Sequence, residues 1–287
     1  MAQTKHQIEA LLAEAGSHPR HRFGQNFMID QNLVRLVAEA GGVAKGDLVV
    51  EVGPGTGTLT EELLDRADDV VVVEIDRDLA AVLRRRFADR PNFRLIEGDA
   101  LAGKHELNPQ LTAVLQTAAE RGKSARLVAN LPYNIASPLV IGLLVDGVHT
   151  LAFTVQKEVA DRLRAPAGGE AYGPLTVMVQ LMAKVEVLRN LPPQAFWPAP
   201  KIDSSLVRLT RDDRLGAMAR PFGRFVHAVF SFRRKTLRRA LSQAGYDADD
   251  LLAATRFDGQ LRPEVFTPEQ LLRMFQFASG SPAAGGR

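Results

Sequence analysis

The sequence predicts an α/β protein with a doubly wound, mostly parallel sheet of seven strands. Short apolar runs rich in β-branched residues alternate with segments whose apolar residues recur at helical spacing. Such alternation is typical of parallel strands joined by helical crossovers. Past residue 210 the pattern becomes entirely helical, which predicts a small all-helical domain. The predicted strands are 48–52, 70–73, 93–96, 126–129, 151–155, 175–187 and 205–209.

Length and composition limit the classes to which the chain can belong. Its 287 residues can bury one large core and a small second one. We expect a first domain at residues 1–209, a helical domain at 210–280 and a disordered tail at 281–287. Cysteine is absent from the sequence, which excludes disulfides and thiol catalysis. We also expect no metal site, because His18 and His21 have no partner ligands nearby, and no membrane partner, because the aliphatic runs are short.

Three consecutive strand ends bear residues suited to a nucleotide-like ligand. The first strand runs into a loop containing Gly53, Gly55 and Gly57 and then into a helix, an arrangement in which main-chain N–H groups meet a polar ligand. The second strand ends at Glu74, which is placed to accept hydrogen bonds from both hydroxyls of a ribose. The third is followed by Asp99, which is suited to an adenine amino group and is also an ordinary turn residue. Together these favour a cofactor site.

Asn130-Leu131-Pro132-Tyr133 follows the fourth strand. The Asn130 side-chain oxygen and a neighbouring carbonyl can accept hydrogen bonds from the exocyclic amino group of a planar base. Pro132 fixes the turn that aims these acceptors, and Tyr133 offers a face on which the base stacks. The same four residues also suit an ordinary corner between a strand and a turn, so their neighbours decide between the two interpretations.

Basic residues concentrate near the start of the helical region. Between residues 211 and 250 there are nine Arg or Lys against five Asp, although the whole chain has a net charge of only +3. The apolar residues of 222–241 fit one helical face, and Arg234, Lys235, Arg238 and Arg239 fall away from it. Arg233 falls on the apolar stripe, so either the helix breaks near Ser231 or Arg233 reaches a partner. We interpret the outward cluster as a phosphate-binding surface rather than a solvated face, whereas we expect Arg84–Arg86 to be a solvated helix end.

In this order, the motifs closely resemble those of the small-subunit ribosomal RNA adenine dimethyltransferases, the bacterial KsgA/RsmA family. The resemblance runs from about residue 22 to residue 277 and rests on Gln25–Phe27, Glu51–Gly57, Glu74–Asp76, Gly98–Ala100, Asn130–Tyr133, Phe196–Ser204 and Arg233–Thr236. It implies a Rossmann-like class I methyltransferase domain that uses S-adenosylmethionine. It also implies N6,N6-dimethylation of two adjacent adenosines near the 3′ end of 16S rRNA in the small ribosomal subunit.

The resemblance also assigns roles to individual residues. The glycine loop and Gln25-Asn26 would surround the methionine half of the cofactor, Glu74 would bind its ribose, and Ile75 would pack on its adenine. Asn130, Leu131 and Tyr133 would hold the target base, with Phe196 stacking on its other side. The predicted cofactor-binding residues are Gln25, Asn26, Phe27, Glu51, Gly53, Gly55, Gly57, Glu74, Ile75, Asp99, Ala100 and Asn130. The predicted catalytic residues are Asn130, Leu131, Pro132, Tyr133 and Phe196, and the predicted RNA-binding residues are Arg233, Arg234, Lys235, Arg238 and Arg239.

Three other functions are weighed against this one. An NAD-dependent dehydrogenase expects a G-x-G-x-x-G loop, but here the third glycine comes one residue early. The 23S rRNA dimethyltransferases of the macrolide-resistance class share the catalytic motifs, so only the C-terminal helices and residues 196–204 argue against them. A non-catalytic role in ribosome assembly is compatible with the same fold. We expect a cytoplasmic monomer.

Overall fold

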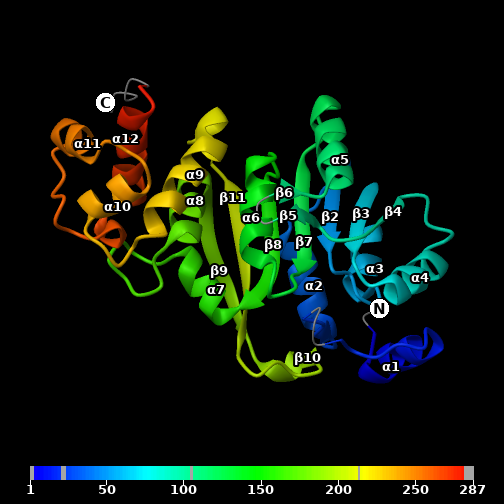
Figure 1. Ribbon diagram of the computed structural model, residues 1–287. Helices are drawn as coiled ribbons and strands as arrows, with labels where there is room; N and C mark the ends of the chain where they lie inside the picture. The colour runs from blue at the N-terminus through cyan, green and yellow to red at the C-terminus, as the bar shows by residue number, and fades with distance from the viewer. Residues whose placement is uncertain (1–2, 21–23, 104–105, 213, 281–287) are drawn as a thin grey trace. The chain divides into compact units, whose positions relative to one another are not determined.

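The computed structural model describes residues 3–20, 24–103, 106–212 and 214–280 (Figure 1). The chain divides into two compact units, one formed by Met1–Ala160 and Val185–Arg211 and the other by Asp161–Lys184 and the chain from Asp212 onward. The predicted first domain is unbroken from 1 to 209, whereas in the structure residues 161–184 cluster with the helical unit. The predicted tail, 281–287, lies outside the described residues.

The first unit contains a seven-stranded sheet with the strand order β4-β3-β2-β7-β8-β11-β9. Neighbouring strands from β4 to β8 run parallel, and β11 runs antiparallel to β8. These pairings confirm the mostly parallel, seven-stranded sheet. The strands are β2 (Leu48–Val52), β3 (Asp69–Glu74), β4 (Phe93–Glu97), β7 (Ala125–Asn130), β8 (Thr150–Gln156), β9 (Ala183–Leu191) and β11 (Ser204–Arg211). The short pairs are β1 (Phe27–Met28) with β10 (Phe196–Trp197), and β5 (Leu101–Gly103) with β6 (Glu106–Leu107).

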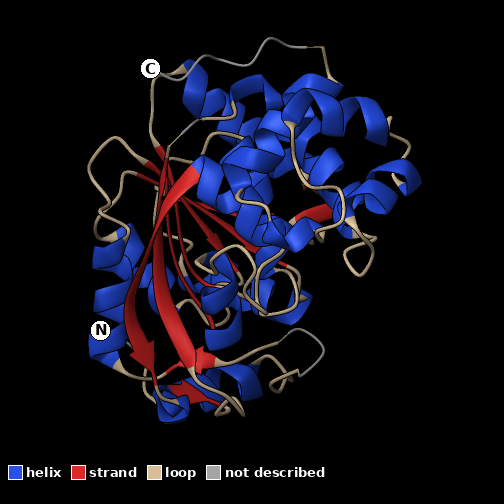
Figure 2. Cartoon of the chain, turned by 90° about the vertical axis from the view of Figure 1, so that its left-hand side faces the viewer, coloured by secondary structure: helices blue, strands red, loops and turns tan. Residues whose placement is uncertain are grey.

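Helices cover both faces of this sheet (Figure 2). They are α1 (Lys5–Glu14), α2 (Gln31–Ala40), α3 (Thr58–Leu64), α4 (Arg77–Arg86), α5 (Pro109–Glu120), α6 (Ala136–Val145) and α7 (Lys157–Leu163). The crossovers through α3 and α4 lead from β2 toward β4, and the crossover through α6 leads from β7 toward β8. Because nearly all such crossovers are right-handed, opposite directions place the helices on opposite faces. The strand order therefore reverses between β2 and β7.

The second unit is helical and has an aromatic core. Its helices are α8 (Pro174–Met182), α9 (Ala219–Phe230), α10 (Leu237–Gln243), α11 (Ala248–Thr255) and α12 (Pro268–Ala278). The Phe225 ring centroid lies 5.7 Å from that of Phe275 and 5.1 Å from that of Tyr246. A capping box begins α12, because Thr267 and Gln270 each accept the other's main-chain N–H through their side chains.

The prediction of a strand at 175–187 is wrong over most of its length. Residues 174–182 form α8, and β9 begins only at Ala183. The run from Leu175 to Met182 is nearly all apolar and has no period, so a buried helix and a buried strand look alike in it. The useful signal is Gly173-Pro174, because proline at the first helical position favours a helix start.

The apolar stripe of 222–241 is divided between two helices. Helix α9 ends at Phe230 and α10 begins at Leu237, so the helix breaks near Ser231, which was one of the two alternatives. We name the exposed residues Arg233–Lys235 in the intervening turn, together with Arg238 and Arg239 on α10, the basic turn. Arg233 is exposed because it lies in this turn and not on the apolar face of a helix.

One residue of the helical unit adopts a costly backbone conformation. Arg256 ends α11 with φ of 59°, the left-handed region that favours glycine. Arg256→Gly should therefore raise the free energy of unfolding by up to about 1 kcal/mol, because the relief of strain slightly exceeds glycine's greater entropy loss. Chemical denaturation measures this change. Arg256→Ala, which keeps the strain, should give no gain, and an equal gain in both variants would contradict this explanation.

Candidate functional site

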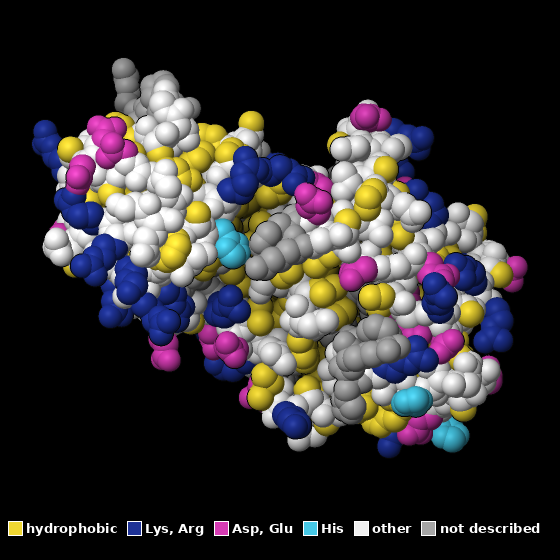
Figure 3. Space-filling view, in the orientation of Figure 1, with side chains coloured by type: hydrophobic (Ala, Val, Ile, Leu, Met, Phe, Trp, Pro, Cys, Tyr) yellow, Lys and Arg dark blue, Asp and Glu magenta, His cyan; other side chains and the backbone are white. Residues whose placement is uncertain are grey.

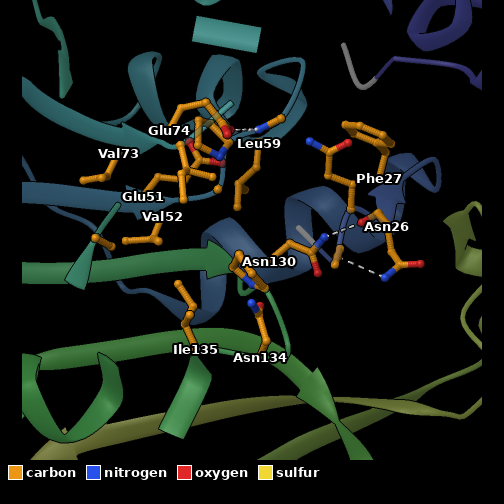
Figure 4. A pocket seen from close by; sticks show the side chains of 18 of the residues that line it. Asn26, Phe27, Glu51, Val52, Leu59, Val73, Glu74, Asn130, Asn134 and Ile135 are labelled. Atoms are coloured by element: carbon orange, nitrogen blue, oxygen red, sulfur yellow. Dashed lines mark hydrogen bonds between the residues drawn. The ribbon is translucent and has the colours of Figure 1, made fainter. Parts of the chain in front are cut away.

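A cavity opens at the carboxyl ends of β2, β3, β4 and β7 (Figure 4). It has about 900 Å³ of space, part of it continuous with solvent. Its position, where the strand order reverses, is where open α/β sheets bind ligands. The predicted residues that line it are Gln25, Asn26, Phe27, Glu51, Gly53, Gly55, Glu74, Ile75, Asp99, Ala100, Asn130 and Pro132. Sequence reasoning missed other lining residues, including Val52, Leu59, Asn134 and Ile135.

The glycine loop forms one wall of the cavity. Gly55 has φ of 62°, and a Cβ there would lie 2.7 Å from Cε1 of Phe27. Its main chain therefore lies directly against an aromatic ring that also lines the cavity. Gly57 does not line the cavity; it begins α3 with φ of 86°, and a Cβ there would lie 2.6 Å from Cε2 of Phe87. Its role in this structure is to let α3 pack closely.

Hydrogen bonds from outside the cavity hold the loop in place. The Thr56 carbonyl accepts from Arg86 at 2.6 Å and from the Gln3 side chain at 3.3 Å, and the Thr56 hydroxyl donates to Gln3 Oε1 at 2.5 Å. Arg86 also pairs with Glu61 at 2.9 Å. The prediction that Arg84–Arg86 is simply a solvated helix end is therefore wrong for Arg86, whose side chain is only 19% exposed.

Two buried carboxyl groups lie side by side in the cavity wall. Burial is the main cause that raises the pKa of Glu51 to about 8; a hydrogen bond from Thr60 opposes this rise, and the charge of Glu74 adds to it. Burial also raises the pKa of Glu74 to about 7. The Glu74 carboxylate accepts from the main-chain N–H of Asp76 at 2.9 Å and of Gly55 at 3.2 Å. A ligand that brings a positive charge or hydroxyl donors would favour the ionised carboxylates.

Ile75 and Asp99, two further predicted cofactor contacts, are exposed enough to touch a ligand. The Ile75 side chain is 42% exposed, an unusual state for a large apolar residue next to a buried strand. Asp99 is exposed, and one of its oxygens accepts from the main-chain N–H of Leu101 at 3.0 Å, so the turn interpretation also holds.

Asp76 links the end of β3 to the segment that contains Arg20 and Gln25. Its buried carboxylate accepts from Arg20 at 3.0 Å and from the Gln25 amide at 3.1 Å, while Arg20 also pairs with Asp78. The Gln25 oxygen accepts from the main-chain N–H of Arg20 at 2.8 Å. Both ends of the Gln25 amide are thus engaged within the protein. Sequence reasoning missed this role of Asp76, although it lies two residues after Glu74.

Asn130 lies on the cavity wall between two hydrogen-bond partners. Its amide nitrogen donates to the main-chain carbonyl of Asn26 at 2.6 Å, as Figure 4 shows, and its Oδ1 accepts from the hydroxyl of Thr154. The oxygen predicted to face a target base is therefore also bonded within the protein. The next residue, Leu131, is buried, and its N–H donates to the Thr154 carbonyl at 3.3 Å.

The two aromatic residues predicted to stack on a base do not line the cavity. The Tyr133 hydroxyl lies 2.9 Å from the Ser204 hydroxyl, and burial raises the pKa of Tyr133. Phe196 is only 2% exposed and belongs to a core cluster with Met28 and Leu206. Stacking by either ring stays a prediction.

The basic turn belongs to the helical unit. Arg238 forms an ion pair with Asp249 on α11, whereas the remaining four cations have no acidic partner among the residues that the structure describes. Figure 3 shows Lys and Arg side chains gathered over α10. Three consecutive exposed cations, Arg233–Lys235, together with Arg239 suit a polyanion.

Neither a metal site nor a membrane-spanning helix is found within the described ranges. No group of three His, Asp or Glu there could hold a metal ion. No helix there is long and apolar enough to cross a membrane.

The sheet order and the cavity at its carboxyl edge define a class I methyltransferase fold. Residues 16–279 match the ribosomal RNA adenine dimethylase family, and the chain belongs to that family. It is 39% identical to ribosomal RNA small subunit methyltransferase A of Moorella thermoacetica, over 91% of this chain and 93% of that protein. It is 42% identical to the protein of the same name from Pseudomonas syringae pv. syringae, over 89% of this chain and 92% of that protein.

Solved structures show the same fold. The 23S rRNA methyltransferase ErmE is 28% identical, with a TM-score of 0.60 over 88% of this chain and all of that chain. A dimethyladenosine transferase from Plasmodium falciparum is 23% identical, with a TM-score of 0.67 over 88% of this chain and 98% of that chain.

The close contact between Gly55 and Phe27 predicts a specific binding defect. Gly55→Ala should push the Phe27 ring toward the cavity, at a cost of about 1–3 kcal/mol, so S-adenosylmethionine should bind roughly tenfold more weakly or worse. Calorimetry measures the affinity. The matched control is Gly46→Ala, because Gly46 also has a positive φ, of 89°, but nothing within 4 Å of a Cβ. Equal affinities in the two variants would show that the contact does not shape the cavity.

Proposed function

We propose that this protein transfers methyl groups from S-adenosylmethionine to N6 of two adjacent adenosines in the 3′-terminal hairpin loop of 16S rRNA, giving N6,N6-dimethyladenosines. One observation supports this most strongly: Asn130 and Glu74 line the same cavity, so an acceptor for an amino group and an acceptor for ribose hydroxyls lie together. Family membership and the names of the curated relatives support the RNA substrate and the small subunit.

The cavity fits S-adenosylmethionine. Glu74 is positioned for the ribose hydroxyls, and Ile75 presents an exposed apolar surface on which an adenine can pack. Asp99 has a carboxylate oxygen for the adenine amino group, and the Gly53–Gly55 main chain leaves room for the methionine half. When bound, this cofactor supplies a methyl group activated by a sulfonium.

The residues of the chain would act on the other reactant, the adenine. The N6 lone pair is delocalised into the ring, so the amine is a weak nucleophile. Hydrogen bonds from N6–H to Asn130 Oδ1 and to the Leu131 carbonyl would favour a more tetrahedral nitrogen and aim its lone pair. Catalysis would then be mainly orientation and electrostatic preorganisation. To reach the cavity, the base has to leave its stack.

No strong general base is required, because a methylated amine loses its proton readily. Glu51 suits this view, because it lines the cavity and its carboxyl group accepts a hydrogen bond from the Thr60 hydroxyl. Glu51 and Asp99 would therefore act in cofactor binding rather than as an acid–base pair.

The alternative is methylation of 23S rRNA. ErmE is named for that activity and shares the fold, but its identity to this chain is only 28%. The relatives named for the small subunit are 39% and 42% identical, which favours 16S rRNA.

We further propose that the protein works as a cytoplasmic monomer, because assembling small subunits are its substrate. A role in subunit assembly can accompany catalysis.

The test is to incubate the protein with labelled S-adenosylmethionine and separate unmodified small and large subunits, and then to map the methylated bases. Two adjacent dimethyladenosines in the terminal hairpin of 16S rRNA are expected. Label in 23S rRNA alone would favour the alternative, and label in neither would refute both.

The raised pKa of Glu74 predicts that cofactor affinity depends on pH. Ribose hydroxyls donate to the carboxylate, so binding favours its ionised form, whereas in the cofactor-free protein Glu74 is half protonated at about pH 7. Affinity should be highest above that pH and fall by up to about tenfold per unit below it. Calorimetry between pH 5.5 and 8.5 measures this dependence. Glu74→Gln should weaken binding and flatten the profile over this transition. An unchanged profile in that variant would exclude Glu74 as the titrating group.

The basic turn predicts salt-dependent binding of ribosomal particles. Replacing Arg234 and Lys235 with Ala should weaken binding and reduce the slope of log affinity against log salt by about 0.7–0.9 for each cation lost. Filter binding at several salt concentrations measures the slope. The control is replacement of Arg256 and Arg262, which removes the same charge elsewhere in the helical unit. If both double variants behave alike, only the overall charge matters.

A further inference from the structure

Thr154 is a buried hydroxyl in an apolar stretch of β8. Its neighbours from Leu151 to Val155 are Ala or larger apolar residues, and its own side chain is fully buried. Burying a hydroxyl is unfavourable unless it is hydrogen-bonded, so a valine would suit a purely structural role at this position. Thr154 does not line the cavity. Its hydroxyl donates to Oδ1 of Asn130, which does line it.

The two partners of Asn130 fix the direction of its amide. The main-chain carbonyl of Asn26 can only accept, so it requires the Asn130 nitrogen to face it, at 2.6 Å. The oxygen then faces Thr154, whose hydroxyl has to donate. A flipped amide would set two oxygens against each other at Asn26 and is disfavoured.

Strand pairing also fixes the position of Thr154 relative to Asn130. The two residues are paired in the register of the parallel strands β7 and β8, and the Leu131 N–H donates to the Thr154 carbonyl at 3.3 Å. Thr154 thus binds the main chain of the turn and the side chain of Asn130 together. Without the hydroxyl, the Asn130 oxygen would have no hydrogen-bond partner among the described residues, and the amide would be held at its nitrogen alone.

We propose that Thr154 is a positioning residue for methyl transfer: it holds Asn130 Oδ1 in one orientation and leaves its second lone pair for N6–H of the target adenine. This inference rests on the proposed function. Thr154 touches neither the cofactor nor the base, and it acts through Asn130. Its loss should therefore slow methyl transfer without changing cofactor affinity.

The experiment compares Thr154→Val, which keeps the shape and removes the hydroxyl, with Thr154→Ser, which keeps the hydroxyl. Single-turnover methylation of unmodified small subunits is measured with cofactor and particles saturating. Thr154→Val should be about tenfold to a hundredfold slower, because a misdirected catalytic group costs rates of this order. Thr154→Ser should stay within about threefold of the unaltered protein, and both should bind S-adenosylmethionine normally, which also shows that they fold. A matched control is Thr150→Val in the same strand, whose hydroxyl contacts Arg126 and His149 instead.

A double-variant comparison separates positioning from a general structural effect. If Thr154 acts through Asn130, Thr154→Val should cause no further slowing in an Asn130→Ala background. Equal slowing in both backgrounds, weakened cofactor binding, or a normal rate in Thr154→Val would each overturn the inference. A protein that fails to methylate small subunits even without substitutions would refute the proposed function instead, so the two failures are distinguishable.

Discussion

The hydrogen bond between the Asn130 amide and the Asn26 carbonyl, at 2.6 Å, is the contact on which the rest of the site depends. Asn130 ends β7, and Asn26 belongs to the segment that covers the cavity beside the glycine loop. The bond therefore joins the part of the site that would hold a target base to the part that would hold the cofactor. A parallel sheet allows this, because its strand ends meet at one edge, and the reversal of strand order opens the space between them.

The same edge also holds two carboxyl groups in an apolar surrounding. Glu51 and Glu74 are 2% and 3% exposed, and burial raises the pKa of both. Each is satisfied by short local hydrogen bonds, from Thr60 in one case and from two main-chain N–H groups in the other. Carboxylates held in this way need no reorganisation when a hydroxyl-bearing, positively charged ligand arrives. This arrangement suits the proposed cofactor, which carries a ribose and a sulfonium.

Sequence reasoning predicted the sheet and the cavity lining well because both follow from local pattern. Buried parallel strands are short and apolar, and Gly53, Gly55, Glu74 and Asp99 all come within three residues after a predicted strand. The strand error arose where the local pattern is ambiguous, as in 175–187, and two alternatives stayed open where a turn interrupts a long apolar stripe, as at Ser231. Contacts between distant segments could not be predicted at all. Thr154 looked like one more strand residue, and the bonds from Gln3 and Arg86 to Thr56 span more than twenty residues of sequence.

The most direct test of this account is single-turnover methylation of unmodified small subunits by Asn130→Ala. The variant removes the side chain that would aim the adenine amine and leaves Glu74, the glycine loop and the basic turn unaltered. With cofactor and particles saturating, the account predicts a rate at least about a hundredfold lower, even where loss of the Asn26 contact weakens S-adenosylmethionine binding. Asn134→Ala, which changes another asparagine of the cavity wall, should cost much less. A near-normal rate in Asn130→Ala under saturating conditions would contradict the central claim.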